Sequence, residues 1–155
     1  MEYSSCVWDP YTQNNVTKIE RIQRRAARWV TNQYNYETST TDILKKLNWT
    51  PLEERRAKNK VLIFQKARHG KIEIPIDDVH INNNNTRSQG TTFRIPHSRT
   101  NAHLHSFYPS TIRLFNSLPG VLINVTNPDL LKDKLKTVTL RSHYLTNSAD
   151  RSGSI

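Results

Sequence analysis

The stretch TPLEERRAKNKVLIFQKARHG, Thr50 to Gly70, carries the clearest structural signal in the chain. Thr50 suits a helix N-cap, Pro51 suits the first helical position, and Glu53 stands where a capping box places an acid. At the other end, basic side chains precede Gly70, and glycine is the residue most often found just past a helix C-terminus. The stretch therefore predicts a helix over 51–69 with both of its ends marked.

Four further helical segments flank this one. A helix from about 16 to 33 and a short one from about residue 40 precede it, and helices opened by Pro109 and Pro128 follow it. Between them, prolines and an asparagine-rich run predict extended chain with short strands. We expect a mainly α fold, with four to five helices in a small irregular bundle and an extended or short-strand segment at about 70–108.

The same pattern predicts how the chain is divided. The parts are an aromatic, turn-rich lead-in at 1–15, a helical part at 16–70, an extended, Asn-rich segment at 71–108, C-terminal helices at 109–140 and a disordered tail at 141–155.

The charge balance favours an acidic partner. The formal net charge is +10 and the pI is near 10.0, which points first to phosphate backbones and then to anionic membranes. No apolar run approaches the roughly 18 residues of a membrane-spanning helix, and the N-terminus does not resemble a signal peptide. We expect an intracellular protein, nuclear or cytoplasmic, without a membrane partner. A basic globular protein with no nucleic-acid role stays open as an alternative.

Residues that could support catalysis are few. The four glycines are not clustered, so no phosphate-binding loop is predicted. Asp77 and Asp78 are the only adjacent acidic pair outside a helix start, in a polar turn. His97, His103 and His105 lie close together, but no cysteine or acidic residue nearby would complete a tetrahedral metal site. We expect no enzyme activity, no metal and no cofactor.

The segment KIERIQRRAARWV, residues 18–30, is the strongest candidate binding surface. Four arginines occupy one row of the helix at i, i+3, i+4 and i+7: Arg21, Arg24, Arg25 and Arg28. The apolar residues form a second stripe, expected to face the core: Ile19, Ile22, Ala26, Trp29 and Val30. Glu20 is the only acid in this helix. The row predicts phosphate contacts, because arginine can bind phosphate with two donors at once; a merely solvated amphipathic helix is the alternative.

The helix over 51–69 offers a second set of candidates. Glu53 and Glu54 can pair with part of its basic residues, so its charge is less available than that of the first helix. The second-rank candidates for nucleic-acid contact are Arg55, Arg56 and Lys60. If all four arginines of the first helix contacted duplex phosphates, log K would fall against log salt with a slope of about −3.6.

Four motifs occur in an order that resembles a known family: VWDPY at 7–11, KIERIQRRAARWV at 18–30, LNWTPLEERR at 47–56 and SFYPSTIRLFNSLP at 106–119. Together they are similar to the C-terminal (thumb and post-reverse-transcriptase) region of non-LTR (LINE-type, jockey-like) retrotransposon polyproteins. The resemblance covers residues 2–140. It implies that 16–70 is a thumb-like part that contacts RNA or DNA.

The resemblance also implies what is missing. The metal-binding aspartates of the polymerase palm, typically in a Tyr/Phe-x-Asp-Asp turn, have no counterpart in this sequence. The endonuclease domain of the family has no counterpart in it either. The chain is thus expected to be a non-catalytic remnant of an RNA-directed DNA polymerase that binds RNA or DNA backbone through basic helices. The alternative is a protein-interaction or structural helical module, which would place its apolar stripes against a missing palm or another chain.

Overall fold

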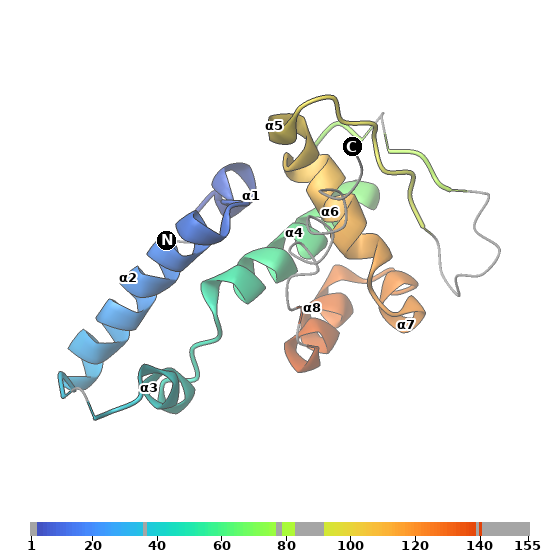
Figure 1. Ribbon diagram of the computed structural model, residues 1–155. Helices are drawn as coiled ribbons and strands as arrows, with labels where there is room; N and C mark the ends of the chain where they lie inside the picture. The colour runs from blue at the N-terminus through green and yellow to red at the C-terminus, as the bar shows by residue number, and fades with distance from the viewer. Residues whose placement is uncertain (1–2, 36, 77–78, 83–91, 139, 141–155) are drawn as a thin grey trace.

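The computed structural model describes residues 3–35, 37–76, 79–82, 92–138 and 140, and it is mainly helical (Figure 1). The helices are α1 (Ser5–Trp8), α2 (Gln13–Thr31), α3 (Thr40–Lys46), α4 (Leu52–Arg68), α5 (Asn101–Leu104), α6 (Phe107–Asn116), α7 (Gly120–Ile123) and α8 (Pro128–Thr137). The predicted fold class is confirmed. The five predicted helices correspond to α2, α3, α4, α6 and α8, and the three additional ones are single turns of four residues.

Helix α4 is the element on which the others assemble. It contacts α6 and α8 on one side of the molecule and α1 and α2 on the other, while α3 packs against α2 (Figure 1). The N-terminal helices α2 and α3 form the end of the molecule that lies away from α6, α7 and α8. The position of α2 is therefore set by contacts with α3 and α4.

The hydrophobic core lies between α4 and the C-terminal helices. Phe64, Phe93 and Phe115 meet edge to face, with ring centroids 5.2 to 5.7 Å apart. All three rings are at most 4% exposed, and Ile112 and Leu131 are fully buried around them. Phe93 belongs to the extended segment, so this core also holds that segment in place.

The extended segment is shorter than predicted. Residues 71–76, 79–82 and 92–100 contain no helix, and Ile81 and Phe93 form an isolated antiparallel bridge. However, α5 begins at Asn101, where the Thr100 hydroxyl accepts a hydrogen bond from the His103 amide at 3.3 Å. Most of the Asn-rich run, and the tail predicted at 141–155, lie outside the described residues.

The helix-end predictions were partly right. Gly70 has a φ of +64°, which fits its predicted place after α4. The Asn127 side chain accepts a hydrogen bond from the Asp129 amide at 2.9 Å and caps α8 as expected. The capping box at Thr50 is not formed. Instead, the Glu53 amide donates to Glu20 Oε1 at 2.9 Å, so an acid of α2 caps α4 across the interface.

Among the described residues, no helix has both the length and the apolar character that crossing a bilayer requires.

Candidate nucleic-acid interface

The buried face of α2 differs from the predicted one. Val16, Gln23 and Ala27 are at most 7% exposed and face the neighbouring helices. Gln23 Nε2 donates a hydrogen bond to the Thr50 carbonyl at 3.0 Å, which ties α2 to the chain that enters α4. The small side chain of Ala27 allows close approach at this face. The buried face of α2 therefore consists of Val16, Gln23 and Ala27, and it is less apolar than the predicted one.

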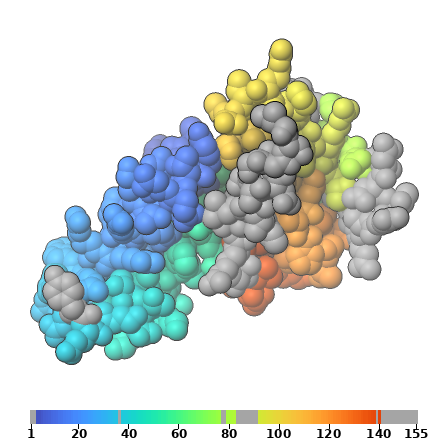
Figure 2. Space-filling model, viewed as in Figure 1, coloured from blue at the N-terminus to red at the C-terminus, as the bar shows by residue number. Residues whose placement is uncertain are grey.

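The apolar stripe of α2 is largely outside the core. Ile22, Trp29 and Val30 are 52%, 74% and 57% exposed, so the prediction that this stripe is buried was wrong. Ile19 and Ala26 are only half-buried. The reason is that α3 and α4, the helices that contact α2, cover the side with Gln23 and Ala27 and leave the stripe beside it in solvent. Figure 2 shows α2 as part of the open surface of its end of the molecule.

Three of the four predicted arginines share an exposed surface. Arg21, Arg24 and Arg25 are exposed, and none of them forms an ion pair or side-chain hydrogen bond with another described residue. Arg21 and Arg25 are four residues apart, about 6 Å along the helix axis. We call Arg21, Arg24 and Arg25 the arginine row.

The fourth arginine has a structural role. Arg28 is half-buried, and its guanidinium donates to Thr40 Oγ1 at 3.0 and 3.3 Å. Two longer contacts of 3.5 Å reach the carbonyl oxygens of Asn35 and Thr38. Arg28 therefore fastens the connection between α2 and α3, and its donors face the protein.

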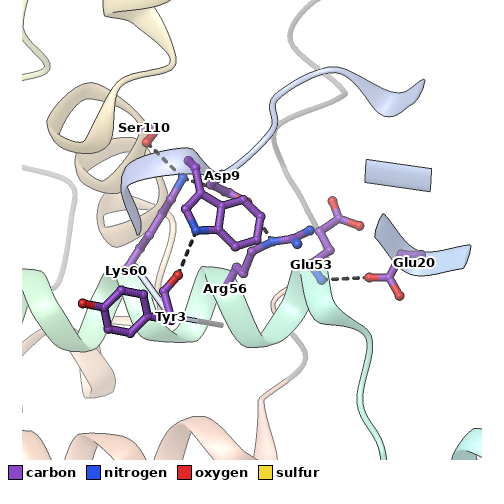
Figure 3. A network of polar contacts seen from close by, with 8 residues as sticks. Tyr3, Asp9, Glu20, Glu53, Arg56, Lys60 and Ser110 are labelled. Atoms are coloured by element: carbon purple, nitrogen blue, oxygen red, sulfur yellow. Dashed lines mark hydrogen bonds and ion pairs between the residues drawn. The ribbon is translucent and has the colours of Figure 1, made fainter. Parts of the chain in front are cut away.

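Two residues of α4 that were predicted to contact nucleic acid point into the protein. The side chains of Arg56 and Lys60 are 1% and 4% exposed. Arg56 Nε lies 2.8 Å from Asp9 Oδ1, and Lys60 Nζ lies 2.7 Å from Asp9 Oδ2 (Figure 3). Their burial does not fit the prediction that they bind phosphate. Arg55, the remaining candidate of α4, is half-buried.

The lead-in motif VWDPY explains why these cations can be buried. Asp9 comes directly after α1 and supplies the carboxylate between the two cations. The Trp8 ring lies 5.9 Å from the Arg56 guanidinium, and its Nε1 donates to the Tyr3 carbonyl at 2.8 Å. The terminal nitrogens of Arg56 find no hydrogen-bond acceptor among the described residues. Sequence reasoning missed Asp9; an acid inside an otherwise aromatic, turn-rich motif was the available signal.

Two histidines of the predicted cluster contact different residues. His105 stacks on Tyr11 with ring centroids 4.2 Å apart and planes 5° from parallel. Burial, and then the charges of Arg113 and Lys60, lower the pKa of His105. His103 Nδ1 lies 3.0 Å from Ser98 Oγ. No three metal-ligating side chains come together in the part of the chain that the structure describes; Asp77 and Asp78 lie outside it.

A cavity of about 590 Å³ lies beside α1, α4 and the start of α8. Leu62, Ile63 and Phe107 contribute apolar walls, and Lys66 and Lys132 contribute the cations. None of its lining residues belongs to α2. The arginine row is therefore a convex helix surface separate from this cavity.

Comparison of the chain with protein-family models, with curated proteins and with solved structures finds no match. The chemistry of the exposed surface of α2 and the motifs quoted above are thus the basis for a functional proposal.

Proposed function

We propose that this chain is a non-catalytic, thumb-like region related to LINE-type reverse transcriptases and that it binds RNA or DNA backbone through the arginine row. Such a role would place it in the nucleus or cytoplasm. The observation that carries the proposal is the exposure of Arg21, Arg24 and Arg25 on one helix face, unpaired with any described residue. The resemblance of the four motifs to that family supports it.

The chemistry of the arginine row suits a phosphate backbone. Each guanidinium presents several N–H donors in a planar fork that matches a phosphate group. Because these side chains are exposed and lack ion-pair partners among the described residues, binding would not first have to break an internal salt bridge. The contacts would be with the backbone and would not read base sequence.

The salt dependence of binding follows from the number of contacts. Three phosphate contacts predict a slope of log K against log salt of about −2.7 for duplex and about −2.1 for a single strand. These values replace the −3.6 expected from four arginines, because Arg28 is engaged with Thr40.

The test is the triple variant Arg21→Gln/Arg24→Gln/Arg25→Gln, assayed by fluorescence anisotropy on labelled RNA and DNA over a salt series. We expect the affinity to fall and the slope to approach zero. The matched control replaces three exposed lysines of α8, Lys132, Lys134 and Lys136, by Gln, which changes the net charge equally. Unchanged binding in the arginine variant, or equal losses in both variants, would overturn the assignment to α2.

A protein-interaction role is the second candidate, and one observation favours it. Ile22, Trp29 and Val30 expose apolar surface on α2, whereas Val61 and Phe64 of α4 are buried in the core. If this role is correct, the protein should self-associate or bind another protein through α2, and sedimentation velocity would detect the assembly. Monomeric protein that binds RNA through the arginine row would contradict it.

A further inference from the structure

Trp29 lies in a solvent-facing position next to the arginine row. Its side chain is 74% exposed, and its indole makes no ring contact or hydrogen bond with the rest of the described chain. Trp8, by contrast, is held by its contact with Arg56 and its hydrogen bond to Tyr3. Internal packing therefore gives no reason for a large aromatic side chain at position 29.

The neighbours of Trp29 on the helix surface are mixed in character. Lys18, Ile22, Arg25 and Trp29 are separated by four, three and four residues, so they follow one another along one row of α2. All four are exposed. Arg25 belongs both to this row and to the arginine row, so Trp29 stands about one helical turn from a proposed phosphate contact.

This arrangement suits an unpaired nucleic-acid strand. Exposed aromatic rings beside cations bind single strands because bases stack on the rings while the cations follow the backbone. A duplex keeps its bases stacked inside, so it could use the cations but not the indole. Ile22, Ala26 and Val30 lie beside Trp29 and could serve a protein partner, but Lys18 and Arg25 in the row of Trp29 give this surface a positive charge, which favours an anionic strand.

We infer that α2 prefers single-stranded nucleic acid to duplex, with a base stacked on Trp29 and the phosphates on the arginine row. The inference rests on the proposed function, because it assumes that the arginine row binds phosphate. It adds the class of nucleic acid that the surface selects.

The test compares Trp29→Ala, Trp29→Phe and the control Val30→Ala, which truncates an apolar side chain of similar exposure on the same helix. The probes are a labelled oligouridylate and a hairpin duplex RNA with the same number of phosphates. Trp29→Ala should weaken oligouridylate binding about 5- to 150-fold and duplex binding less than twofold. Trp29→Phe should retain most of the affinity, Val30→Ala should bind normally, and the salt slope of Trp29→Ala should equal that of the wild type.

The outcomes separate this inference from the proposed function. If Trp29→Ala binds oligouridylate normally while the triple arginine variant does not, stacking is refuted and the arginine row stands. If neither variant loses affinity, both fail. Equal losses on oligouridylate and duplex would overturn the preference for single strands. Dissociation of a dimer by Trp29→Ala, without a change in RNA affinity, would identify a protein contact and also overturn it.

Discussion

Asp9→Ala should strongly destabilise the N-terminal half of the chain. Its carboxylate lies 2.8 Å from Arg56 Nε and 2.7 Å from Lys60 Nζ, and both cationic side chains are at most 4% exposed. Removing one partner of a buried ion pair costs about 3–5 kcal/mol, because the other charge remains buried without compensation. Here one carboxylate lies against two buried cations.

The remaining contacts of the two cations compensate only in part. Lys60 keeps a hydrogen bond of 3.4 Å to Ser110 Oγ, and Arg56 keeps the Trp8 ring. We therefore expect a loss of about 4–5 kcal/mol, which is a large share of the 5–15 kcal/mol that stabilises an ordinary domain. For a chain of this length the midpoint of thermal unfolding should fall by about 8–20 °C. Asp9→Asn should be milder, because its amide oxygen can still accept a hydrogen bond.

The assay is urea and thermal unfolding followed by circular dichroism. The matched control is Asp133→Asn, which breaks the exposed 2.7 Å pair with Lys136 on α8 and should leave the midpoint unchanged. Asp9→Asn/Lys60→Met should be more stable than Asp9→Asn alone, since it also removes one of the two buried charges that faced the carboxylate. A midpoint for Asp9→Ala equal to that of the control would refute the reasoning.

Two further predictions concern single contacts. Glu20→Ala removes the acceptor for the Glu53 amide, so it should cost about 1 kcal/mol of unfolding free energy; urea unfolding should show this loss, and the exposed Glu37→Ala should not. The lowered pKa of His105 means that the unfolded chain binds the proton more tightly than the folded protein. Stability should therefore fall as the pH drops below the ordinary histidine value of 6.5 and through the folded-state pKa. His105→Phe keeps a ring against Tyr11 and should lose this part of the pH dependence of stability. A stability–pH profile of His105→Phe identical to that of the wild type would contradict the prediction.

Local signals were sufficient to predict the five longer helices, but not the single turns α1, α5 and α7. The start of α8 follows from Asn127 and Pro128, and the end of α4 follows from Gly70, because these residues act through their own backbone conformation or through the nearest amides. Helical spacing of apolar residues located α2 and α3 in the same way. Pro109 located α6, although this helix begins two residues earlier, at Phe107. The exposure of Arg21, Arg24 and Arg25 agrees with the predicted row, but Arg28 of the same row is half-buried against Thr40, which the spacing did not indicate.

The sequence by itself therefore determined the helical class, the main helix positions and a surface row of arginines. Only the tertiary structure decided which face of α2 is buried, because periodicity reveals an apolar stripe but not whether a neighbouring helix covers it. It likewise showed that Asp9 pairs with Arg56 and Lys60 and that Glu20 caps α4. These partners lie 33 to 51 positions apart along the chain. The spacing of neighbouring residues in the sequence does not reveal contacts between such distant positions. Burial thus removed two cations from the candidate surface and left Trp29 exposed beside the arginine row.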